Sequence, residues 1–119
     1  MESNNVKVWH NPRCGKSREA VKTLEELHID AEVIKYLDTS LDVNKIKSIL
    51  KMLGISAREL MRTTEAIYKE LNLKNEEDEE KLIEAMVQNP KLIQRPIVIK
   101  GSKAIIARPA SLIADFLNA

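Results

Sequence analysis

The sequence predicts an α/β fold in which a βαβ unit comes first, a helical block follows, and a ββα unit ends the chain. Three observations support this order. Apolar residues alternate over 6–9 and then recur at helical spacing, and a β-branched run follows over 31–37. Near the end of the chain, Gly-Ser joins the apolar runs 95–100 and 103–108, which predicts an antiparallel hairpin with a type II′ turn.

The first predicted unit is a parallel pair of strands connected by a helix. Val6 and Val8 lie at alternate positions of the first strand. The helix is expected to run from near residue 17 to residue 27, and the second strand over 31–37. Strand, helix and strand in this order imply a right-handed crossover between parallel neighbours.

The middle of the chain, from about residue 42 to residue 89, predicts a block of helices. Asp42 can cap a first helix, and Gly54 is placed to end it. Ser56 and Glu59 fit a capping box, so a short helix is expected to continue through Arg62.

The rest of this block predicts two more helices. One begins at Thr63-Thr64, and the other follows the acidic run 75–80, because acidic side chains stabilise the first turn of a helix. Asn89-Pro90 ends the last of them, since proline restricts the residue before it.

The C-terminal part supplies the hairpin and a terminal helix that begins at Pro109. At the start of the third strand, a cis bond before Pro96 could bring Arg95 near the first βα loop, although the sequence leaves the isomer open. With the helical block set aside, βαβ followed by ββα is the order of a thioredoxin-like sandwich. We therefore expect one domain over residues 1–119, with a helical insertion at about 42–89 between the second and third strands.

The composition argues against several classes of function. The chain has 119 residues and a formal net charge of +1, and four of its residues are Phe, Trp or Tyr, so neither a basic excess nor an aromatic platform suggests nucleic-acid binding. A single cysteine cannot form an internal disulfide, which favours a reducing cytoplasm. One cysteine and two distant histidines cannot make a zinc site. No apolar run approaches the ~20 residues of a membrane span.

The candidate reactive group is Cys14, which lies at the predicted strand-to-helix turn. There the first backbone N–H groups of the helix have no internal partner and favour an anion. Arg13, Lys16 and Arg18 crowd the same turn, and nearby cations lower a cysteine pKa from its usual ~8.5. A lone cysteine is more often a small buried hydrophobe. This polar, cationic loop instead predicts an exposed and reactive thiol.

The same turn contains an incomplete phosphate-binding motif. Gly15-Lys16-Ser17 is similar to the end of a Walker A loop, which needs a glycine five residues earlier. That position is His10, so nucleotide binding is not expected.

Four separate motifs lie along the chain: His10-Asn11-Pro12-Arg13-Cys14 with Ser17-Arg18, Gly54-Ile55-Ser56 leading to Arg62, Arg95-Pro96-Ile97, and Arg108-Pro109. Together they resemble the glutaredoxin-dependent arsenate reductases, and the resemblance covers nearly the whole chain, from Val6 to Leu117. The resemblance implies a thioredoxin-like fold. It also implies an enzyme that reduces arsenate to arsenite with electrons from glutathione and glutaredoxin. It implies no bound cofactor, and we expect a monomer.

The resemblance also implies roles for individual residues. Cys14 matches the nucleophile, whereas Arg62, Arg95 and Arg108 match the arginines that surround the oxyanion. His10 and Ser17 match supporting positions beside the cysteine. Structural readings stay open: His10 could make a plain hydrogen bond and Ser17 could cap the helix. An isolated arginine is usually a solvated surface charge, and His28 is expected to have no role.

Two other functions remain open. A regulatory protein of the Spx type resembles these reductases in fold but binds RNA polymerase, and such proteins commonly carry a second cysteine where this chain has Ser17. Alternatively, an oxidoreductase of this kind could act on another oxyanion or on a glutathione-linked thiol, because three arginines do not distinguish arsenate from phosphate or sulfate.

Overall fold

The computed structural model describes residues 6–37, 41–108 and 110–118. It divides into two compact units, Met1–Thr39 with Arg95–Ala119, and Ser40–Gln94. The second unit is the predicted helical block with slightly wider bounds. That all 119 residues act as one domain stays a prediction.

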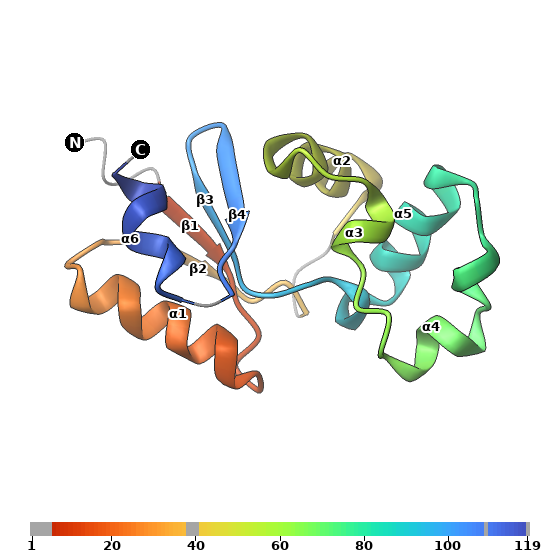
Figure 1. The fold of residues 1–119 in the computed structure, drawn as a ribbon, viewed down its shortest axis with the longest axis horizontal. Coiled ribbons are helices and arrows are strands. Elements are labelled where there is room, and N and C mark those ends of the chain that lie inside the picture. Colours follow the sequence, from red (N-terminus) through yellow and green to blue (C-terminus); the bar gives the residue numbers. More distant parts are fainter. Residues whose placement is uncertain (1–5, 38–40, 109, 119) are drawn as a thin grey trace. The chain divides into compact units, whose positions relative to one another are not determined.

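The first unit is built on a four-stranded mixed sheet (Figure 1). Its strands are β1 (Val6–Trp9), β2 (Glu32–Ile34), β3 (Ile97–Lys100) and β4 (Lys103–Ile106), in the spatial order β2-β1-β3-β4. The pair β1 and β2 is parallel, whereas β3 is antiparallel to both β1 and β4. The predicted parallel pair and hairpin are therefore confirmed.

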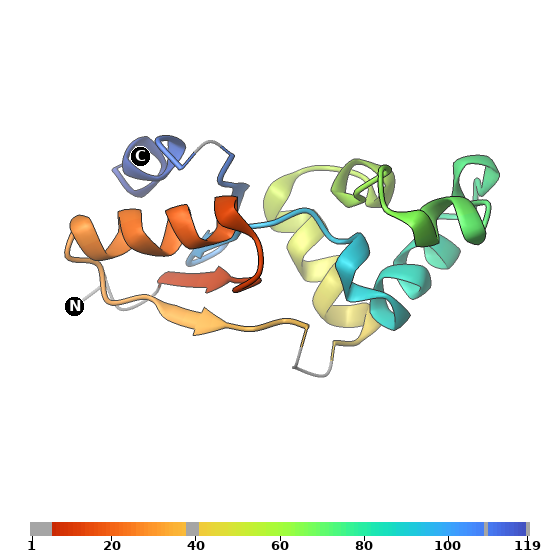
Figure 2. The same cartoon turned by 90° about the horizontal axis from the view of Figure 1, so that it is seen from below.

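Two helices, α1 (Gly15–Glu26) and α6 (Leu112–Leu117), cover the same face of this sheet (Figure 2). They bury the apolar side chains that alternate along the strands. The cluster they form contains Val6, Val8, Ala20, Leu24, Val98, Ala107 and Ile113. The alternation seen in the sequence thus produces the core of this unit.

Some boundaries differ from the sequence-based expectation. Helix α1 starts at Gly15 and β2 covers only 32–34 of the predicted run 31–37. The earlier helix start makes Cys14 the N-cap residue of α1. The turn between β3 and β4 has φ 61° at Gly101, as the first central position of a type II′ turn requires. The peptide bond between Arg95 and Pro96 is cis.

The other unit contains helices and short 3₁₀ turns. They are α2 (Val43–Leu53), α3 (Ala57–Leu60), α4 (Ala66–Glu70), η2 (Leu73–Asn75), α5 (Glu79–Gln88) and η3 (Pro90–Leu92). Helix α5 packs against both α2 and α3. Their buried apolar residues include Ile46, Ile49, Leu60, Leu82, Ile83 and Met86. These recur at three- and four-residue spacing, which places them on one face of each long helix.

The predicted caps of this unit are confirmed. The Asp42 carboxylate accepts from the Lys45 N–H at 2.8 Å. Gly54 ends α2 with φ 70°, in the left-handed region. The capping box of Ser56 and Glu59 is complete, because each side chain accepts from the other residue's backbone N–H.

The acidic run is the start of α5, where Asp78 accepts from the Glu80 N–H at 3.0 Å. Two predictions nearby were wrong. Helix α3 ends at Leu60, and Met61 instead pairs with Ile93 in an isolated antiparallel bridge. Helix α4 begins at Ala66 and not at Thr63-Thr64. Backbone pairing with the η3 segment overrides the local helical preference here. Pro109, the predicted start of the last helix, lies outside the described residues.

Across the residues that the structure describes, no helix combines the length and apolar character that crossing a bilayer requires.

Candidate active site

Cys14 lies at the end of the loop between β1 and α1, directly before the first residue of α1, and its side chain is partly exposed. Its backbone is extended, with φ −98° and ψ 124°, and its N–H donates to the Asn11 carbonyl at 3.0 Å. The backbone N–H groups of Lys16 and Ser17 hydrogen-bond the Cys14 sulfur. These are donors that the first turn of a helix cannot satisfy internally. The predicted position of the thiol at the start of a helix is confirmed.

The surroundings lower the pKa of Cys14. Burial acts against ionisation and is the largest single influence, because it removes water from the charged form. The Ser17 N–H, the Arg95 side chain and the Lys16 N–H together outweigh it, since each hydrogen-bonds the sulfur and favours the thiolate. The positive charge of Arg95 adds to this effect. The structure thus brings Arg95, from the start of the β3 segment, to the cysteine.

The source of the stabilisation differs from the sequence-based expectation. Arg13, Lys16 and Arg18 were expected to lower the pKa of Cys14 through their charges. In the described part of the chain, that effect comes from two backbone N–H groups and from Arg95 instead. Arg13, Lys16 and Arg18 are exposed to water, which screens a charge, and none of them shifts the pKa of Cys14 through its charge. The Arg18 Nη1 donates to the Pro12 carbonyl at 2.9 Å and so holds the loop in shape.

His10 and Ser17 form a buried network beneath the cysteine loop. The Ser17 Oγ lies 2.7 Å from the His10 Nδ1 and accepts from the Asn11 N–H at 2.9 Å. Burial lowers the pKa of His10, the charges of Lys35 and Arg18 lower it further, and the hydrogen bond with Ser17 opposes them. The Ser17 hydroxyl therefore organises the loop, whereas its backbone N–H is the group that contacts Cys14.

Asn11 is the site residue that sequence reasoning missed. It is 6% exposed, its carbonyl accepts from Cys14, and its Oδ1 accepts from the Arg13 N–H at 3.0 Å. An Asn before a proline, three residues ahead of the candidate reactive cysteine, is a turn signal that could have identified it. Asn11 shapes the loop by accepting from two of its N–H groups.

The other predicted arginines are placed differently. Arg108 follows β4 and is exposed, and its guanidinium makes no hydrogen bond or ion pair with the described residues. Arg62 belongs to the helical unit, where its Nε lies 3.3 Å from the Glu65 Oε2. The structure therefore unites Cys14, His10, Ser17 and Arg95. The convergence of Arg62 and Arg108 on the same site stays a prediction.

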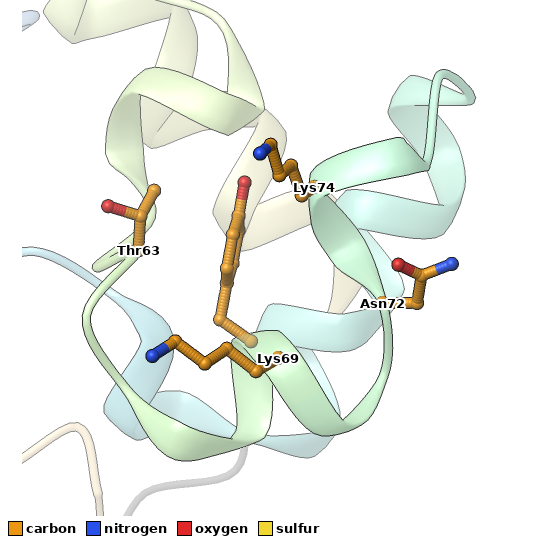
Figure 3. A pocket seen from close by; sticks show the side chains of 5 residues that line it. Thr63, Lys69, Asn72 and Lys74 are labelled. Carbon is orange, nitrogen blue, oxygen red and sulfur yellow. The ribbon is translucent and has the colours of Figure 1, made fainter.

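The helical unit also has an open pocket of about 470 Å³ (Figure 3). It is lined by Thr63, Tyr68, Lys69, Asn72 and Lys74. None of these is a predicted site residue. The pocket is thus lined by residues 63–74, whereas the reactive thiol is that of Cys14. The chemistry of Cys14, and not the pocket, identifies the candidate active site.

The strand order of the first unit and the cysteine at the start of its first helix define a thioredoxin-like α/β protein. A model of the ArsC family matches residues 9–116. The chain belongs to the ArsC family.

Individual relatives cover almost the full chain. An arsenate reductase of Neisseria meningitidis serogroup B is 48% identical over 106 residues, which are 87% of this chain and 91% of that protein. The uncharacterised protein YfgD of Escherichia coli K12 is 50% identical over 115 residues, 95% of this chain and 97% of its own. The solved structure of an arsenate reductase from Vibrio cholerae is 42% identical with a TM-score of 0.89, and the match covers 92% of this chain and 95% of that one.

Proposed function

We propose that this protein reduces arsenate to arsenite with Cys14 as the nucleophile and glutathione as the reductant. The observation that carries the proposal is the Cys14 sulfur, whose pKa is lowered by two helix-start N–H groups and by Arg95. A thiolate is the nucleophilic form of cysteine, so this site is prepared for covalent catalysis.

Arsenate suits such a site because it is an anion with several acceptor oxygens. Arginine binds oxyanions through two parallel N–H donors and keeps its charge at all accessible pH values. We propose that Arg95 both binds the oxyanion and stabilises the thiolate. Arg62 and Arg108 are proposed to complete the binding of the remaining oxygens. His10 and Ser17 support the loop that carries the sulfur.

The reaction is proposed to proceed in three steps. The Cys14 thiolate attacks arsenic(V), and one arsenate oxygen leaves as water, which gives a thiol–arsenate adduct. The glutathione thiolate then attacks the Cys14 sulfur, and the electron pair of the sulfur–arsenic bond stays on arsenic, so arsenite is released. Cys14 is left in a mixed disulfide with glutathione. Glutaredoxin reduces that disulfide by thiol exchange.

An external thiol is needed because the chain has a single cysteine. A second cysteine in the chain could resolve the adduct by forming an internal disulfide, and this chain has none. We expect it to act in the cytoplasm, where reduced thiols are maintained.

The test is a coupled assay that follows arsenate-dependent NADPH consumption with glutathione, glutathione reductase and glutaredoxin. Wild type should turn over and Cys14→Ser should not, while Lys103→Ala serves as a matched surface control. Mass spectrometry of wild type trapped without glutaredoxin should find glutathione on Cys14. Absence of arsenate-dependent turnover in wild type would refute the proposed substrate and favour another oxyanion or a regulatory role.

A further inference from the structure

Both the backbone and the side chain of Arg62 make contacts within the helical unit. Its backbone N–H donates to the Leu92 carbonyl at 2.6 Å, directly after the bridge between Met61 and Ile93. Its Nε lies 3.3 Å from the Glu65 Oε2, and the two side chains are only 19% and 24% exposed. These contacts fix the backbone position of Arg62 and the orientation of its guanidinium.

Glu65 is not explained by the helix that it precedes. It is the N-cap residue of α4, a position that favours Ser, Thr, Asp or Asn because a short side chain can accept from the helix. The Glu65 side chain makes no capping hydrogen bond. It contacts Arg62 instead, so the Glu65 carboxylate binds the arginine and does not cap the start of α4.

The contact leaves the outer edge of Arg62 available. A guanidinium carries five N–H donors, and Glu65 takes only the one on Nε. With the described residues, Nη1 and Nη2 of Arg62 make no hydrogen bond or ion pair. These two nitrogens form the edge that binds an oxyanion through two parallel hydrogen bonds.

Arg58, four residues earlier, shows the contrasting structural use of arginine. Its Nη1 donates to the Tyr68 hydroxyl at 2.6 Å and to the Leu73 carbonyl at 3.1 Å, and its Nη2 donates to the Glu76 carbonyl. Both terminal nitrogens are occupied, and they tie α3 to the segment around η2. Arg62 is oriented through Nε alone, which is the arrangement of a binding arginine.

We propose that Glu65 is a positioning residue that orients the Arg62 guanidinium for the oxyanion substrate. This inference rests on the proposed function, in which Arg62 binds arsenate. An arginine that is already oriented loses less conformational entropy when it binds, so the anion binds more tightly. Because Glu65 acts through Arg62, its loss should affect substrate binding and spare the chemistry at Cys14.

The experiment compares Glu65→Ala, Glu65→Gln, Arg62→Ala and the double variant Arg62→Ala/Glu65→Ala, with the exposed Glu70→Ala on the same helix as control. Glu65→Ala should raise the arsenate KM about five- to tenfold, the scale of one oriented hydrogen bond. The kcat and the KM for glutathione should stay within about twofold. Glu65→Gln keeps an acceptor oxygen, so its arsenate KM should be at least about threefold below that of Glu65→Ala.

Phosphate provides a readout that does not depend on chemistry. It has the same arrangement of oxygens as arsenate but does not oxidise the thiolate, so its inhibition constant reports binding alone. This constant should rise in Glu65→Ala by the same factor as the arsenate KM. In the Arg62→Ala background, Glu65→Ala should have no further effect, because the two residues act as one unit. Circular dichroism and urea unfolding verify that each variant is folded.

The outcomes separate this inference from the proposed function. If Arg62→Ala raises the arsenate KM and Glu65→Ala does not, Glu65 is no positioning residue and the function stands. The inference also fails if Glu65→Ala lowers kcat and KM for both substrates, or if Glu65→Gln is as impaired as Glu65→Ala. If Arg62→Ala leaves the arsenate KM unchanged in an active enzyme, both the role of Arg62 and that of Glu65 are overturned.

Discussion

The Arg95 side chain hydrogen-bonds the Cys14 sulfur, although the two residues lie near opposite ends of the chain. The contact is possible because β1 and β3 are paired, with Trp9 opposite Ile97. The loop after β1 and the residues before β3 therefore meet at the same edge of the sheet. Among the described residues, Arg95 is the one charged side chain that stabilises the thiolate.

Arg95→Ala should raise the pKa of Cys14, because it removes both a hydrogen bond and a positive charge from the sulfur. The acidic limb of alkylation by iodoacetamide should then move to higher pH, since less thiolate exists at a given pH. We expect kcat/KM for arsenate to fall by about tenfold or more, as for other charge-assisted hydrogen bonds.

Arg108→Ala should behave differently, because Arg108 is exposed and is not among the groups that shift the pKa of Cys14. Its alkylation profile should match that of wild type, while the arsenate KM rises if Arg108 binds the oxyanion. Lys103→Ala is the control and should change neither quantity. Equal shifts of the alkylation profile in Arg95→Ala and Arg108→Ala would contradict this assignment.

Ser17→Ala should destabilise the protein without abolishing the lowered pKa of Cys14. The Ser17 hydroxyl is fully buried and serves both His10 and the Asn11 N–H, so its removal leaves polar groups unpaired at a cost of about 2 kcal/mol. The Ser17 backbone N–H still reaches the sulfur in this variant. Urea unfolding measures the first effect and thiol titration the second. A thiol that titrates at its ordinary pKa would show that the hydroxyl acts on Cys14 directly.

Stability should fall in mild acid because of His10. Burial lowers its pKa in the folded state, whereas the unfolded chain has the usual value of about 6.5. As the pH falls below about 6.5, the unfolded state takes up a proton that the folded state does not, so the free energy of unfolding decreases. His10→Asn should make the free energy of unfolding less dependent on pH below about 6.5. Equal slopes in the two proteins would rule out this role for His10.

Gly54→Ala should destabilise the helical unit by about 1–2 kcal/mol, because a residue with a Cβ is strained at positive φ. Gly54 has φ 70° and its missing Cβ would touch nothing within 4 Å, so the cost is one of backbone conformation alone. Gly15→Ala is the matched control, since Gly15 is helical and its Cβ would lie 3.7 Å from the Arg18 Nη2, an ordinary contact. Thermal unfolding of both variants tests the difference, and an equally unstable Gly15→Ala would argue against strain as the cause.

Local signals explain why much of the fold was predictable. The Asp42 cap, the box of Ser56 and Glu59, and the turn at Gly101 depend on residues close together in the sequence. Their energetics are decided within one or two turns of chain, so the residue types alone specify them. The same holds for Cys14, whose helix-start N–H donors come from its immediate successors.

The failures share a different cause. Met61 and Arg62 look helical locally, but Met61 is extended and pairs with Ile93. The charges of Arg13, Lys16 and Arg18 are closer to Cys14 in sequence than that of Arg95, yet Arg95 is the one that reaches the sulfur. Proximity along the chain was a poor guide because side-chain direction and exposure decide whether a charge is felt.

By itself, the sequence determined the order of strands and helices, the caps, and a single thiol at the start of a helix, because these depend on interactions between near neighbours. Only the tertiary structure decided which arginine contacts that thiol and that the Ser17 hydroxyl serves the loop and not the sulfur. Both depend on strand pairing and burial, which bring together groups from distant parts of the chain and remove the water that would otherwise screen them.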